Sequence, residues 1–183
     1  PLPARLPATG LLAANLHWGN AAYAETRGDA EFVVDAETLE LRLRYERPLG
    51  KRFALYAELP WRRTWAGSLD GIIDGWHDIT GLPGDAREGL PRDQLLIEYS
   101  VGDVSRYRFD TPGSGPGDLV VGLGYQLLAS DRSALSAWLG AKAPTGDADE
   151  LTGSGAADVA LSLAGARVLG ARLRVFGQAD AVW

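Results

Sequence analysis

The chain has 183 residues, enough for one domain with a substantial core, and no stretch of it has the composition of a linker between two domains. Its 24 acidic residues outnumber 18 lysines and arginines, and with a net charge of −6 and no basic stripe it lacks the surface of a nucleic-acid-binding protein. The absence of cysteine excludes disulfides, thiolate metal sites and cysteine nucleophiles. No long apolar run occurs, which excludes a transmembrane helix but not a β-barrel, whose apolar residues occupy every second position.

Apolar and polar residues alternate without a break between Leu39 and Glu46. One face of this segment carries leucines and a tyrosine and the other carries glutamates and arginines, the pattern of a strand with one wet face. The same period predicts further strands over residues 12–18, 53–61, 119–127, 135–141, 159–163 and 173–175. The clear segments are about ten residues long, the length that crosses a bilayer at a tilt of about 45°.

Connections of two lengths separate these strands. Short turns are expected over residues 48–51, 129–132 and 168–171. Long polar connections are expected over residues 19–31, 62–93 and 144–157. Short periplasmic turns and long external loops are typical of outer-membrane barrels.

A short internal similarity accompanies two of the strands. Gly113-Ser114-Gly115 precedes Asp118, and Gly153-Ser154-Gly155 precedes Asp158. The similarity indicates either a repeated hairpin or ordinary glycine-rich turn chemistry at two strand starts.

One segment of the longest connection has helical rather than alternating spacing. Ser68 is placed to cap a helix, and Gly81 and Pro83 are placed to end it. The apolar stripe of this amphipathic helix consists of Leu69, Ile72, Ile73, Trp76 and Ile79. Because such a stripe cannot remain in water, we expect it to pack against the barrel mouth or enter the lumen as a constriction, with the outer-leaflet interface as the alternative.

The predicted fold is all-β, an antiparallel up-and-down transmembrane β-barrel of the outer membrane with this one short helix in an external loop. Residues 1–183 form a single domain, and the strand count ends on the external side, which predicts a fragment lacking C-terminal strands. A soluble β-barrel or sandwich with its apolar face inside is the alternative.

The barrel interpretation assigns two sets of side chains by their position along the strands. The lumen-lining set is Glu40, Arg42, Arg44, Glu46, Glu58, Gln126 and Lys142. The lipid-headgroup rim, where tryptophans anchor and arginines pair with phosphates, is Trp61, Arg62, Arg63 and Trp65. His17 also falls on the lumen side, by the parity of its neighbours.

The run from Gly67 to Asp78, continued by Gly81-Leu82-Pro83 and Arg87, resembles the signature of a family of proteobacterial outer-membrane β-barrels classed as a domain of unknown function. Further elements similar to related barrels are Glu58-Leu59-Pro60, Gly117-Asp118-Leu119 and Pro144-Thr145-Gly146-Asp147. Members of that family look longer than this chain. The resemblance implies a location and a fold, and it implies no activity.

Two groups of residues have the composition of a catalytic or metal site. Ser68 and His77 lie near Asp74 and Asp78, but no nucleophile motif accompanies them, and a polar helix face accounts for them. The same helix face, and the acidic residues Asp147, Asp149 and Glu150, offer oxygen ligands for calcium, but neither matches an EF-hand loop. We therefore expect no catalytic residue, cofactor or metal.

Three functions fit this sequence. A passive pore or transporter for small solutes is favoured, with a non-conducting structural barrel of the envelope second and an outer-membrane lipid-modifying enzyme third. The expected partners are outer-membrane lipid and small-molecule solutes, and the sequence does not indicate an oligomeric state. Occupancy of the lumen distinguishes the first two functions, because only an open polar lumen conducts.

Overall fold

The computed structural model describes residues 2–81, 91–170 and 172–183. The chain forms one antiparallel sheet and one short helix, α1 (Asp70–Thr80). The strands are β1 (Leu11–Arg27), β2 (Ala30–Leu49), β3 (Phe53–Trp65), β4 (Leu96–Val101), β5 (Val104–Phe109), β6 (Gly113–Pro116), β7 (Leu119–Ala129), β8 (Ser133–Ala143), β9 (Asp158–Leu169) and β10 (Leu173–Val182).

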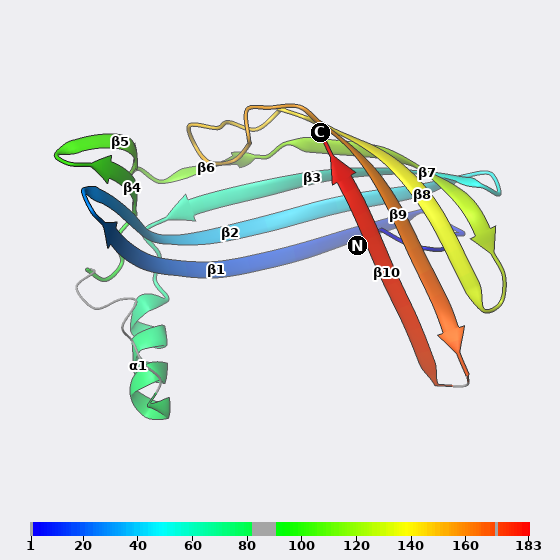
Figure 1. Cartoon of the computed structure of the whole chain (residues 1–183), viewed down its shortest axis with the longest axis horizontal. Helices are drawn as coiled ribbons and strands as arrows, with labels where there is room; N and C mark the ends of the chain where they lie inside the picture. Colours follow the sequence, from blue (N-terminus) through cyan, green and yellow to red (C-terminus); the bar gives the residue numbers. More distant parts are fainter. Residues whose placement is uncertain (1, 82–90, 171) are drawn as a thin grey trace.

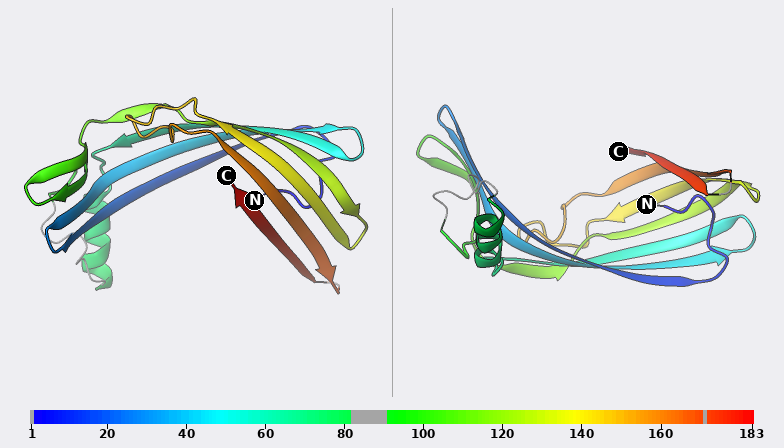
Figure 2. Two further views of the ribbon diagram at one scale, coloured as in Figure 1. Left: turned by 45° about the horizontal axis from the view of Figure 1, so that its top comes forward. Right: turned by 90° about the horizontal axis from the view of Figure 1, so that it is seen from below.

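The sheet is curled into a half-barrel whose long strands run from β1 at one edge to β10 at the other (Figures 1 and 2). Between these edges, β2, β3, β7, β8 and β9 follow one another, each antiparallel to its neighbour. β4 continues the line of β3 along the first part of β2, and β5 pairs with β4. β6 continues the line of β7 along the last part of β3. The half-barrel therefore has a trough, which the N-terminal residues enter (Figure 2).

The convex face of the sheet carries the apolar side chains. Cross-strand pairing sets Leu55 opposite Leu123, Leu123 opposite Leu139, and Leu139 opposite Leu161, so that one row of leucines crosses β3, β7, β8 and β9. These four side chains are 39%, 43%, 56% and 47% exposed. Leu43 on β2 lies opposite Leu59 and is also exposed. The described residues leave this apolar face uncovered.

The buried apolar core is small and lies in two places. Tyr56 and Trp138 pack edge to face, with ring centroids 5.5 Å apart, and Ala54 completes their cluster. At the other end of the sheet, Phe109 and Leu95 pack with Ala36. Most large apolar side chains lie outside these clusters, on the convex face.

The short turns are confirmed: β2 ends at Leu49 before β3, β7 ends at Ala129 before β8, and β9 ends at Leu169 before β10. The predicted long connection over residues 19–31 was wrong. β1 and β2 run on to a two-residue turn at Gly28, whose φ of 67° suits glycine. The alternating pattern is weak there, but the two long strands pair along their whole length, and the rings of Tyr23 and Phe32 meet with centroids 6.3 Å apart.

The helix forms where its spacing predicts, and Gly81 ends it in a left-handed conformation. Ser68 does not cap it: Leu69 is the N-cap residue, and no side chain closes the first turn by a capping hydrogen bond. Instead the buried carboxylate of Glu37 on β2 accepts the backbone N–H groups of Ser68 at 2.7 Å and Leu69 at 2.9 Å, and the Trp18 indole N–H at 2.5 Å.

The apolar stripe of α1 does not enter the trough. Ile72, Trp76 and Ile79 are 69%, 60% and 85% exposed, and the helix leads away from the sheet (Figure 1). Asp70, the first residue of the helix, connects it to the sheet by accepting a hydrogen bond from the Asn20 side chain at 2.8 Å. The expected constriction by this helix is therefore not what the structure shows. Pro83 and Arg87 lie outside the described residues, and no helix in the described part of the chain is long and apolar enough to span a membrane.

Candidate functional site

The concave face of the sheet carries a network of ion pairs between β2 and β3. Pairing sets Glu40 opposite Arg62 and Arg44 opposite Glu58. Arg62 contacts Glu40 at 2.6 Å, and Arg44 lies 3.7 Å from Glu58. Arg42 lies 2.5 Å from Glu40 and 3.5 Å from Glu58, which joins the pairs into one chain of alternating charge.

The network continues along β2, and a second group of ion pairs lies on β8. Arg44 contacts Glu46 at 2.7 Å, and its guanidinium lies over the ring of Tyr56, 4.8 Å from the centroid. On β8, Lys142 pairs with Asp158 of β9 and lies 3.8 Å from Asp118. The whole predicted lumen-lining set thus lies on the concave face, as its alternate positions require.

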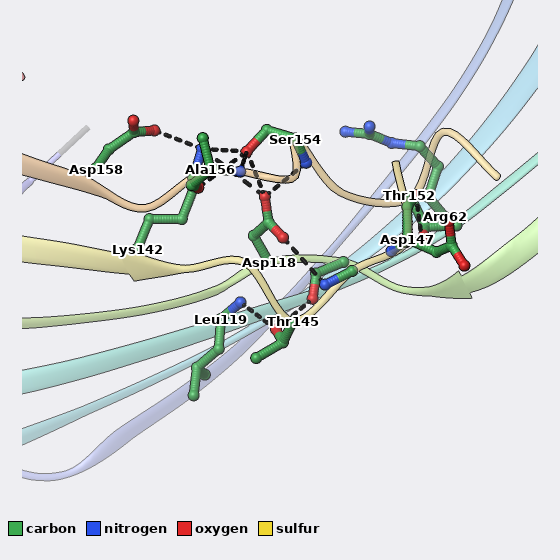
Figure 3. A network of polar contacts seen from close by, with 12 residues as sticks. Arg62, Asp118, Leu119, Lys142, Thr145, Asp147, Thr152, Ser154, Ala156 and Asp158 are labelled. Atoms are coloured by element: carbon green, nitrogen blue, oxygen red, sulfur yellow. Dashed lines mark hydrogen bonds and ion pairs between the residues drawn. The ribbon is translucent and has the colours of Figure 1, made fainter. Parts of the chain in front are cut away.

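The connection between β8 and β9, residues 144–157, folds over the concave face at the end away from the short turns, and Figure 3 shows the polar contacts that hold it. Asp118, just before β7, is its anchor. Its carboxylate accepts the backbone N–H of Gly146 at 3.0 Å and of Ser154 at 2.8 Å, and the Ser154 hydroxyl at 2.9 Å. Thr145 bridges Gly117 and Leu119, accepting the Leu119 N–H at 2.9 Å and donating to the Gly117 carbonyl at 2.9 Å.

This anchor explains two of the short motifs in the sequence. Gly117-Asp118-Leu119 and Pro144-Thr145-Gly146-Asp147 are the two halves of one hydrogen-bonded unit. The glycines are needed for close approach: a Cβ on Gly146 would lie 2.6 Å from Gly153, and a Cβ on Gly153 would lie 2.6 Å from Asp118.

Asp118 lies outside the strands, and its surroundings favour the ionised form. Burial alone would raise the pKa of its carboxyl, but the hydrogen bonds from Ser154 and Gly146 outweigh that effect and hold the pKa below its ordinary value. The charge of Lys142 acts in the same direction.

The folded connection and the ion pairs border two open hollows on the concave face. The larger, of about 550 Å³, is lined by His17, Thr38, Glu40, Arg62, Thr64 and Leu151 among others. The smaller, of about 260 Å³, is lined by Arg42, Glu58, Asp118, Lys142 and Thr152 among others. Arg62 lines both hollows and donates to the Leu151 carbonyl at 3.2 Å. Positively and negatively charged side chains therefore both face the space beneath residues 144–157.

The predicted headgroup rim divides between the two faces. Trp61 lies opposite Leu41 and Arg63 opposite Leu39, on the convex face, and the Arg63 guanidinium lies 5.1 Å from the centroid of the Trp65 ring. Arg62 faces the trough and pairs with Glu40. Its assignment to the rim was wrong, because strict alternation turns the residue between Trp61 and Arg63 to the other side of the sheet.

The acidic residues weighed as calcium ligands have other partners. Asp147 accepts the backbone N–H groups of Asp149 at 2.8 Å and Glu150 at 3.3 Å, which stabilises a turn. Glu150 accepts the Ser114 N–H at 3.2 Å, and Asp74 pairs with Arg92 at 2.8 Å. Across residues 2–81, 91–170 and 172–183, no three histidine or carboxylate side chains gather as a metal site would require.

The two glycine-serine-glycine segments adopt different structures. Gly113-Ser114-Gly115 belongs to strand β6, whereas Gly153-Ser154-Gly155 lies in the folded connection before β9. Their aspartates also differ, since Asp118 anchors that connection while Asp158 pairs with Lys142. The second segment is therefore not a structural repeat of the first.

Residues 14–182 match a protein family described as a protein of unknown function, DUF3187. The chain belongs to this family. Searches of curated proteins and of solved structures found no match. The family is thus established over nearly the whole half-barrel, and it assigns no activity to the concave face.

Proposed function

We propose that the chain forms part of the wall of an outer-membrane β-barrel, with its convex face against lipid and its concave face around a passage for small solutes. One observation carries this proposal: the ion pairs face the trough while the leucine row faces outward, exposed. A soluble barrel has the opposite arrangement. Large contiguous apolar surfaces are rare on soluble monomers and mark contact with a membrane or a protein.

Aromatic residues on the convex face support the same arrangement. Tyr45, Phe53 and Tyr125 lie near the short turns, and the rings of Phe53 and Tyr125 are 5.0 Å apart. Trp18 and Trp61 lie further toward the other end and are 57% and 39% exposed. Two aromatic belts bounding an apolar band are typical of strands that cross an outer membrane.

The ion selectivity of the passage should change when a single charged side chain is neutralised. In planar bilayers containing the protein, replacing Glu58 with glutamine is expected to shift the permeability ratio toward anions by up to about fivefold. That factor corresponds to about 1 kcal/mol, the interaction of two unit charges 4 Å apart in water. The reason is that Arg42 and Arg44 lose a shared partner in the trough. The measurement is the reversal potential in a salt gradient.

Glu31→Gln is the matched control, because Glu31 is an exposed residue beside the distant turn at Gly28 and should leave the ratio unchanged. A conducting protein whose selectivity is the same in both variants would contradict the placement of the trough around the passage. A protein that inserts but never conducts would favour the structural envelope barrel.

A further inference from the structure

The N-terminal residues 2–6 lie inside the trough, at the end near the short turns (Figure 2). They cross from β10 to β7 and are held by side chains of the concave face. Gln126 accepts the Leu6 N–H at 2.8 Å and donates to the Ala4 carbonyl at 2.9 Å. One glutamine amide, which has both an acceptor and a donor, thus engages the backbone on both sides of Arg5, where the chain bends.

Three further side chains hold the same segment. The Pro3 carbonyl accepts the Ser136 hydroxyl at 2.8 Å and the Trp138 indole N–H at 3.3 Å. The Leu2 N–H donates to Gln178 at 2.8 Å. Proline has no N–H to donate, so this segment is suited to a surface that supplies donors to its carbonyls.

Apolar contacts also hold the segment. Leu2 and Leu6 pack against the cluster of Ala54, Tyr56 and Trp138, and we call the surface formed by this cluster, Gln126 and Ser136 the seat of the segment. Trp138 is 1% exposed and Ser136 is fully buried, although both belong to the face that also carries the ion pairs.

Glycines on β7 make room for the two aromatic rings of this seat. A Cβ on Gly122 would lie 2.1 Å from the Tyr56 ring, and a Cβ on Gly124 would lie 2.7 Å from the Trp138 ring. Three neighbouring strands are therefore shaped to form this surface.

We infer that residues 2–6 are an internal plug, seated on Gln126, Ser136, Trp138 and Tyr56, that narrows the passage at the end near the short turns. The narrowing role rests on the proposed function. Side chains of the seat hydrogen-bond to backbone groups of the segment and pack against its two leucines, so that the seat fits the chain's own bent N-terminal segment. Passage of a solute requires the segment to leave its seat or to leave room beside it.

The plug can be tested by thiol labelling, because the chain has no cysteine. Ser136→Cys places a thiol beneath the segment, and Ser105→Cys provides an exposed thiol on β5 as the reagent control. In this background, Leu2→Asp with Leu6→Asp is expected to speed maleimide labelling at position 136 at least tenfold without changing labelling at position 105. Ala8→Asp with Thr9→Asp adds the same charge at exposed positions beyond the seat and should change neither rate.

Single-channel conductance of the same variants completes the test. The Leu2 and Leu6 double substitution is expected to raise conductance, and the Ala8 and Thr9 double substitution is not. Equal labelling at position 136 in both would overturn the plug. Faster labelling with unchanged conductance in a conducting protein would overturn its narrowing role. Faster labelling in a protein that never conducts would overturn the proposed function and leave the seat of the segment established.

Discussion

Replacing Leu139 with arginine is expected to lower the free energy of unfolding by about 2–4 kcal/mol when the protein is folded in lipid vesicles. Leu139 lies in the middle of β8, on the convex face, and is 56% exposed. Arginine there would have to enter the middle of the hydrocarbon layer, where its charge is poorly solvated. The measurement is the midpoint and slope of a reversible urea titration.

Leu135→Arg is the matched control, on the same face of the same strand but close to the short turn, and 36% exposed. Near the interface the cost is expected to fall to about 0–1 kcal/mol. A convex face in water predicts a different result, because substitutions of exposed residues then change stability by only about 0.5 kcal/mol at either position. Equal small effects at both positions would therefore contradict contact with lipid.

Replacing Asp118 with asparagine is expected to lower the free energy of unfolding by about 1–3 kcal/mol at neutral pH. The Asp118 carboxylate accepts the N–H groups of Gly146 and Ser154 on its two oxygens. An asparagine side chain has only one oxygen, so its NH₂ group would face one of these donors and that hydrogen bond would be lost. Residues 144–157 should detach from the concave face as a result. Asp149→Asn removes an equal charge from an exposed residue of the same connection and should have little effect.

The difference in free energy of unfolding between the wild-type protein and Asp118→Asn should depend on pH, and the direction of that dependence follows from the pKa of Asp118. Because the folded protein lowers the pKa of Asp118, its stabilisation is complete above the unfolded value of about 3.9 and is lost as the pH falls through the folded pKa. The difference between the wild-type protein and Asp118→Asn should be constant at and above about pH 5 and shrink on acidification below it. Urea titrations between pH 7 and pH 3 measure it, and a difference that grows on acidification would contradict the assigned hydrogen bonds.

The strands and their two faces were predictable because a period of two is a local property of the sequence. Leu39 to Glu46 shows it directly, and the register then places every alternate residue. The same parity could have placed Arg62 in the trough. It could also have singled out Glu37, a carboxylate on the apolar side of β2 that needs buried partners and finds them in Trp18 and residues 68–69.

The inward-folded connection and the plug could not be predicted in this way, since both depend on contacts between residues far apart in the chain. Gln126 meets residues more than a hundred positions away, and Asp118 meets Ser154. A partial signal was present in Gly122 and Gly124 on β7. Two small residues on the polar face of one strand indicate that larger rings lie over them.

The helix was predictable as an element but not as a constriction. Its spacing and Gly81 set its length. Its position depends on Glu37 and Asn20, which lie on other elements of the fold. The stripe of Ile72, Trp76 and Ile79 is exposed, and apolar periodicity alone does not say against what a helix face packs.

Contact between the convex face and lipid can be measured most directly with nitroxide spin labels on single cysteines introduced along β9. Val159, Leu161 and Leu163 are on the convex face, each 47% exposed, and Ala160 lies between the first two on the concave face. In lipid vesicles, labels at the three convex positions should collide readily with dissolved oxygen and rarely with a water-soluble nickel complex, and the label at position 160 should show the opposite preference. A nickel complex that reaches all four positions equally well would contradict a membrane-facing convex surface.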